Sequence, residues 1–150
     1  SAPERAQGRS FVPLVEGGGY QPNAEVFTEL TYHTYYDPIR AVRTDRYKLI
    51  AFFSTAPRFM EPGQRRRPLT DPWYAPTEGA GGFHQDVELY DLAEDPWEKN
   101  DLASSADHAA IRSDLLQRLH DHMVATADPL LEGAIADPQY ERTMAMIGKI

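Results

Sequence analysis

The chain has 150 residues, enough for one globular domain, and 41% of them are hydrophobic and 25% charged. A net charge of −8 argues against binding to nucleic-acid phosphates, although Arg65, Arg66 and Arg67 form a small basic run. The absence of cysteine excludes disulfides, thiol nucleophiles and cysteine metal sites, and leaves the compartment open. No apolar run approaches the about 18 residues of a membrane span. We therefore expect neither a nucleic-acid nor a membrane partner.

The chain between residues 25 and 92 is typical of antiparallel strands. Segments rich in β-branched and aromatic residues occur at 25–33, 39–44, 47–53 and 87–92. Only Asp45 and Arg46 separate the second segment from the third, which predicts a tight hairpin. Residues 54–83 are rich in proline and glycine and have no periodicity, so they predict a long loop before the last strand.

An amphipathic helix is expected after the strands. Apolar residues recur every four positions at Ile111, Leu115, Leu119 and Met123. Asp107 is the predicted N-cap, and the pair Asp128-Pro129 predicts the stop, because the residue before a proline is pushed out of the helical region. The expected fold is α+β, with about four antiparallel strands covered by one long C-terminal helix near 107–126.

The stretch DVELYDLAEDPWEKNDLA (86–103) places an acidic turn directly after a strand. Val87 and Leu89 alternate with Glu88 and Tyr90, so the strand is expected to bury one face while Tyr90 packs along the other. Asp95-Pro96 then ends it, and the Asp and Asn side chains can accept hydrogen bonds from nearby backbone amides. By itself this predicts a well-formed turn leading from the sheet to the helix.

The order ELYDL, Asp-Pro-x-Glu, Asn-Asp-Leu-Ala and amphipathic helix resembles the C-terminal subdomain of type I sulfatases. The stretch AEVFTELTYHTYYDPIRAVRTDRYKLI (24–50) resembles bacterial enzymes similar to heparan N-sulfatase, the sulfamidases. The segment GRSFVPLVEGG (8–18) resembles the exit from the large catalytic domain. This implies a connecting arm at 1–23, the subdomain at 24–131 and a tail at 132–150. Asp101 stands where an asparagine is commoner, and the loop and tail have no clear counterpart.

The resemblance also implies what this chain lacks. Family members use a formylglycine nucleophile, made from cysteine or, in some bacterial enzymes, from serine, within Cys/Ser-x-Pro/Ala-x-Arg. They also use a calcium-type metal held by the N-terminal domain. Hard cations prefer clustered oxygen ligands, and the sequence shows no such cluster. The string STAPR (54–58) fits the serine motif but follows a hairpin strand, so we interpret it as part of a loop. We expect no catalytic residue, metal ligand or cofactor in this chain, with metal and formylglycine in the missing catalytic domain.

One segment is a candidate substrate rim. Tyr32, His33, Asp37 and Arg40 cluster in the sequence, and the resemblance implies that this segment lies near the mouth of the catalytic pocket. Arginine and histidine can donate to sulfate oxygens, and aromatic rings pack on sugar faces. The alternative is a structural pair between Arg40 and Asp37 with buried tyrosines. His120 and His122 lie two apart on the expected helix, so they predict surface histidines and not a metal pair.

The sequence therefore predicts a non-catalytic C-terminal part of a sulfuric ester or sulfamate hydrolase. In the intact enzyme it would complete the fold and the rim for a sulfated sugar. Two alternatives stay open: the C-terminal part of a phosphonate or phosphate monoester hydrolase of the same superfamily, and a free-standing interaction module. A subdomain separated from its catalytic partner exposes apolar surface, so we also expect the chain to associate with itself.

Overall fold

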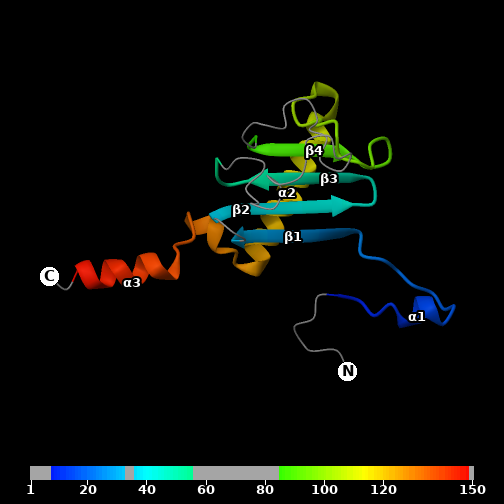
Figure 1. Ribbon diagram of the computed structural model, residues 1–150. Coiled ribbons are helices and arrows are strands. Elements are labelled where there is room, and N and C mark those ends of the chain that lie inside the picture. Colours follow the sequence, from blue (N-terminus) through cyan, green and yellow to red (C-terminus); the bar gives the residue numbers. More distant parts are fainter. Residues whose placement is uncertain (1–7, 33–35, 56–84, 149–150) are drawn as a thin grey trace, which may run out of the picture.

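The computed structural model describes residues 8–32, 36–55 and 85–148, and an antiparallel sheet forms its centre (Figure 1). Its four strands are β1 (Glu25–Tyr32), β2 (Tyr36–Thr44), β3 (Tyr47–Phe52) and β4 (Val87–Asp91). They lie side by side in chain order, and each neighbouring pair is antiparallel. The predicted hairpin joins β2 to β3. The expected α+β fold is confirmed.

One long helix crosses one face of this sheet (Figure 1). It is α2 (Ala109–Thr126), preceded by the 3-10 turn η2 (Ala106–His108), so the helix expected near 107–126 is confirmed. The predicted N-cap at Asp107 is wrong, because this residue lies inside η2, and His108 occupies the cap position without a side-chain cap bond. The predicted stop is correct: Ala127 is left-handed, with a φ of 53°, and Asp128 is extended before Pro129.

The core lies between α2 and the sheet. Register pairing places one apolar residue from each strand in a row across the face that α2 covers: Phe27, Val42, Leu49 and Leu89. The helix supplies Leu115, Leu119 and Met123, which are buried in the same cluster. The strand alternation and the four-residue helical spacing therefore direct their apolar side chains into one shared layer.

The acidic turn after β4 closes the outer edge of that strand. The Asp101 carboxylate accepts hydrogen bonds of 2.9 Å from the backbone amides of both Leu89 and Ala103. Leu102 N–H donates to the Leu89 carbonyl at 2.8 Å. Asp95 likewise accepts from the amides of Lys99 and Asn100. These carboxylates serve as acceptors for backbone donors, as the turn interpretation predicted.

β4 buries side chains on both of its faces. Glu88 and Tyr90 lie on the face away from α2 and are nevertheless buried. The Tyr90 hydroxyl donates to the Glu88 carboxylate at 2.8 Å, so these polar atoms are paired below the surface. A buried polar group is tolerated when it is hydrogen-bonded.

Two helices form in the terminal segments, where the sequence predicted none. α1 (Val12–Val15) precedes β1, and α3 (Pro138–Ile147) follows a 3-10 turn, η3 (Pro129–Glu132). Both extend away from the sheet (Figure 1). None of the helices in the described ranges combines the length and apolar character needed to cross a membrane.

Candidate substrate rim at the ends of β1 and β2

The predicted rim residues lie where β1 ends and β2 begins. Tyr32 is the last residue of β1, while Asp37 and Arg40 lie in β2. The antiparallel pairing places Tyr32 opposite Tyr36, next to Asp37 in the chain. His33 falls between the two strands and lies outside the described residues. The fold thus brings the three described rim candidates to one corner of the sheet.

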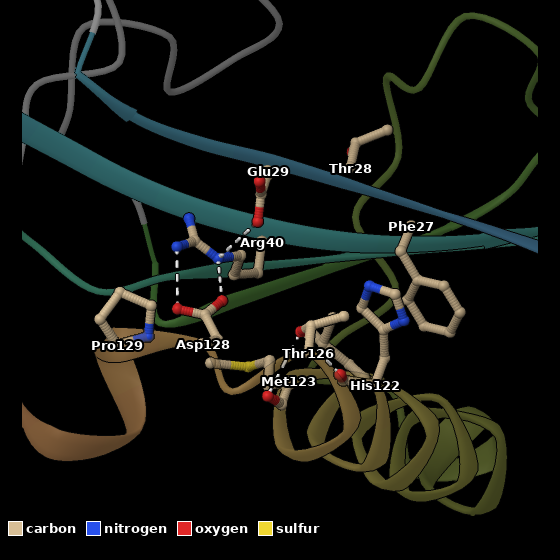
Figure 2. A pocket seen from close by; sticks show the side chains of 10 residues that line it. Phe27, Thr28, Glu29, Arg40, His122, Met123, Thr126, Asp128 and Pro129 are labelled. Atoms are coloured by element: carbon tan, nitrogen blue, oxygen red, sulfur yellow. Dashed lines mark hydrogen bonds and ion pairs between the residues drawn. The ribbon is translucent and has the colours of Figure 1, made fainter. Parts of the chain in front are cut away.

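Arg40 is a buried residue with only 4% of its surface exposed. Its side chain points toward α2, and its Nε and Nη2 donate to the two carboxylate oxygens of Asp128 at 2.5 and 3.0 Å (Figure 2). Its Nη1 donates to the backbone carbonyls of Leu30 and Ile39 at 2.8 and 2.9 Å. The planar guanidinium thus joins β1, β2 and the chain beyond α2 at one point.

Asp128 is the partner of Arg40, and sequence reasoning missed this role. Its carboxylate also accepts from the Leu130 amide at 3.0 Å, which caps η3. Hydrogen bonds from Arg40 hold the pKa of Asp128 below its usual range, against the opposing effect of burial. The Asp128 carboxyl is therefore ionised at neutral pH. The available sequence signal was an arginine in a strand, which requires a carboxylate partner when buried.

A hollow of about 380 Å³ opens beside this ion pair, between β1 and the end of α2 (Figure 2). The Phe27 and His122 rings stack in it, with centroids 3.9 Å apart and planes 2° from parallel. The side chain of Glu29 is 77% exposed, and its carboxylate lies 3.9 Å from Arg40 Nε. His122 is thus half-buried against β1, whereas His120 is exposed, as predicted.

Tyr32 and Tyr36 hold the chain beyond η3. The Tyr32 hydroxyl donates to the Ile135 carbonyl at 3.0 Å, and the Ile135 amide donates to the Tyr36 hydroxyl at 3.1 Å. Desolvation and the nearby Asp137 carboxylate raise the pKa of Tyr32, so its hydroxyl stays protonated and can donate. We call these two tyrosines with Ile135 the tyrosine clamp. It fixes the segment just before α3 at the corner of the sheet where the rim candidates lie.

Asp37 has a separate partner. Its carboxylate is buried and accepts from the Ser54 hydroxyl at 3.0 Å. Arg40 therefore pairs with Asp128 and not with Asp37, and Tyr32 is 40% exposed. The alternative of a structural Arg40–Asp37 pair with buried tyrosines thus differs from the observed contacts in both respects. Ser54 is the first residue of the STAPR string, whose positions 56–58 lie outside the described residues.

The corner holds donors and acceptors but no cluster suited to a metal. Within residues 8–32, 36–55 and 85–148, no group of three or more His, Asp or Glu side chains could hold a metal ion. Most of the donors of Arg40 are directed to groups of this chain. The corner holds β1, β2 and the segment 128–137 in a fixed arrangement. It also presents polar side chains at its margin.

Comparison with known proteins identifies the family. Residues 27–136 match the family described as the C-terminal region of aryl-sulfatase. The ulvan-active sulfatase of Formosa agariphila is 32% identical over 142 residues, which cover 91% of this chain and 28% of that protein. This chain therefore spans little more than a quarter of the curated relative that it matches.

Solved structures share the fold. A 2-O GAG sulfatase matches 93% of this chain and 25% of its own, with a TM-score of 0.62 and 24% identity. A protein solved with its substrate D-glucosamine-2-N,6-O-disulfate matches 85% of this chain and 22% of its own, with a TM-score of 0.56 and 19% identity. Since the family match extends over most of its length, the chain belongs to the family of aryl-sulfatase C-terminal regions.

Proposed function

We propose that this chain is the non-catalytic C-terminal part of a sulfatase that releases sulfate from a sulfated sugar. The match of residues 27–136 to the aryl-sulfatase C-terminal region carries this proposal. The curated relative is named for activity on ulvan, which supports a sulfated polysaccharide as the substrate class. The resemblance to sulfamidases adds N-sulfated sugars as candidates beside sulfate esters.

The reaction itself belongs to the larger part of such an enzyme. The chain contains no cysteine, its string STAPR (54–58) that fits the serine form of the motif is interpreted as part of a loop, and its described residues hold no metal cluster. These residues therefore do not fit the formylglycine and calcium-type metal that the family implies, and no catalytic step is assigned to them. We place both groups in the larger catalytic part of the polypeptide.

Activity measurements test this assignment. The complete polypeptide is expected to release sulfate from sulfated oligosaccharides, while residues 1–150 alone release none from aryl sulfates or N-sulfoglucosamine, with or without calcium. Sulfate release by residues 1–150 that Ser54→Ala abolishes would contradict the proposal and assign a catalytic role to STAPR. Release of phosphate but not sulfate by the complete polypeptide would favour the phosphonate or phosphate monoester hydrolase alternative.

We also propose that Tyr32, His33, Asp37 and Arg40 form a substrate rim in the complete enzyme. His33→Ala should then lower kcat/KM for a charged sugar by about tenfold to a hundredfold, the loss of one charged hydrogen bond. A small aryl sulfate should be spared, because a remote contact serves binding of the larger substrate. Equal losses on the two substrates would place His33 in the catalytic centre or the folding core.

Arg40 needs its own control, because it is bound to Asp128. Arg40→Ala removes the cation, whereas Asp128→Asn keeps the cation and removes its charged partner. A direct contact of Arg40 with substrate predicts that only Arg40→Ala weakens the sugar reaction. Equal effects of the two variants would mean that Arg40 positions the corner and does not bind the sugar.

A further inference from the structure

α3 carries an apolar stripe that nothing in the described structure covers. Tyr140, Met144 and Ile147 lie four and three residues apart, so they share one face of the helix. Their exposed fractions are 59%, 47% and 58%. We call these three residues the tail stripe. A helix of 10 residues is shorter than the about 12–15 at which isolated helices become even marginally stable in water, so α3 needs a packing partner.

The segment that leads into the N-terminus of α3 is held in place, although the helix itself extends away from the sheet (Figure 1). The tyrosine clamp holds Ile135 through both its amide and its carbonyl. Asp137 then caps the helix, accepting from the Gln139 amide at 2.6 Å. A helix that starts from a fixed point projects its stripe in a defined direction. Such an arrangement suits docking onto a surface that is also fixed relative to the sheet.

Two observations bear on what covers the tail stripe. The family match ends at residue 136, and α3 begins at Pro138, so the helix lies outside the segment that the family model describes. The chain corresponds to 28% of the ulvan-active sulfatase, so a much larger part of such an enzyme accompanies a region of this kind. Docking within one polypeptide avoids the loss of translational and rotational freedom that binding between molecules requires.

A second copy of this chain is a less favourable candidate for covering the tail stripe. Stable interfaces between proteins bury about 800 Å² on each partner, and three side chains of one short helix offer only part of that area. We infer that the tail stripe docks in an apolar groove on the larger, catalytic part of the same polypeptide. This inference rests on the proposed function, because it names the part of the sulfatase that covers α3. Docking there would hold the rim corner against the catalytic part.

Hydrogen exchange of the α3 backbone amides tests the inference without measuring activity. Residues 139–147 should exchange rapidly in the 150-residue chain and about a hundredfold more slowly in the complete polypeptide, because burial of the stripe suppresses local opening. Replacing the tail stripe by Tyr140→Ser, Met144→Ser and Ile147→Ser in the complete polypeptide should restore rapid exchange. Met146→Ser is the matched control, since Met146 is 69% exposed but lies off the stripe, and it should leave the protection unchanged.

Three outcomes would overturn the inference. Rapid exchange of α3 in the complete polypeptide would show that the stripe is not docked. Protection that Met146→Ser removes as fully as the triple replacement would assign it to helix propensity and not to the stripe. Protection in the 150-residue chain that grows with its concentration would identify a second copy as the occupant. A protected α3 in a polypeptide that releases no sulfate would refute the proposed function but keep the docking.

Discussion

At the scale of single residues, Arg40 and Asp128 depend on each other. Their side chains are 5% and 4% exposed, so loss of either partner leaves a buried charge without its counterion. Asp128→Asn should therefore lower the free energy of unfolding by about 3–5 kcal/mol. Urea titration at low temperature measures this change. Adding Arg40→Met to Asp128→Asn should recover part of the loss, and a strictly additive double variant would contradict the coupling.

A more exposed ion pair gives the contrast. Arg46 donates to Asp91 at 2.8 Å, but its side chain is 57% exposed. Solvent screens such a pair, so Arg46→Gln should change the free energy of unfolding far less than Asp128→Asn does. Similar losses for Arg46→Gln and Asp128→Asn would show that burial does not set the strength of these pairs.

The two aspartates also predict how stability depends on pH. Hydrogen bonds from Arg46 and Arg40, respectively, lower the folded-state pKa of Asp91 and Asp128. The unfolded value for aspartate is about 3.9, so their contribution is complete well above that pH and is lost as the pH falls through the folded-state pKa values. The free energy of unfolding should thus decrease as the pH falls below about 5. Asp91→Asn should make this decrease smaller, and an unchanged pH profile would contradict the assignment.

The rim corner shows why a site is harder to predict than a fold. The sequence placed Tyr32 and Arg40 together because they are near in the chain. It could not pair Arg40 with Asp128, since 88 residues separate them and the pair Asp128-Pro129 already had an explanation as a helix stop. Ile135 was missed for a similar reason, because its contribution to the tyrosine clamp comes from its backbone atoms.

At the scale of elements, repeated patterns were sufficient for prediction and single positions were not. The hairpin between β2 and β3 follows from two similar apolar segments with Asp45 and Arg46 between them. The helical spacing from Ile111 to Met123 likewise located α2. The prediction of Asp107 as the N-cap failed because nothing in the sequence distinguished η2 from the first turn of α2. The packing of Tyr90 on the second face of β4 was expected, but the burial of Glu88 beside it was not, because a glutamate is seldom fully buried unless it is paired.

Asp101 gives an element-scale prediction about the acidic turn. One of its carboxylate oxygens accepts from both Leu89 and Ala103, which fixes the turn to the edge of β4. Asp101→Ala should lower the free energy of unfolding by about 1–3 kcal/mol, because both amides lose this acceptor. Asp101→Asn retains an acceptor oxygen and should have a much smaller effect. Thermal denaturation compares the two, and equal losses would mean that the charge matters more than the acceptor.

At the scale of the whole molecule, apolar surface is concentrated in the segments outside the core. Phe11, Val12, Leu14 and Val15 in and beside α1 are all at least half exposed. Such surface favours association, so the 150-residue chain should form dimers or larger species at high concentration. Sedimentation velocity over a range of concentrations measures this. Leu14→Ser with Val15→Ser should shift the distribution toward monomer, and a wild-type chain that is monomeric throughout would refute the prediction.

The long connection between β3 and β4 has a consequence for folding kinetics. β1, β2 and β3 follow one another with short links, whereas a much longer stretch of chain separates Phe52, at the end of β3, from Val87, at the start of β4. The entropy of closure grows slowly with loop length, by about 0.6 kcal/mol for each doubling. We therefore expect the β2–β3 hairpin to nucleate folding and β4 to join late. Insertions in that connection should therefore raise the unfolding rate slightly while leaving the folding rate almost unchanged, because the connection closes after the transition state.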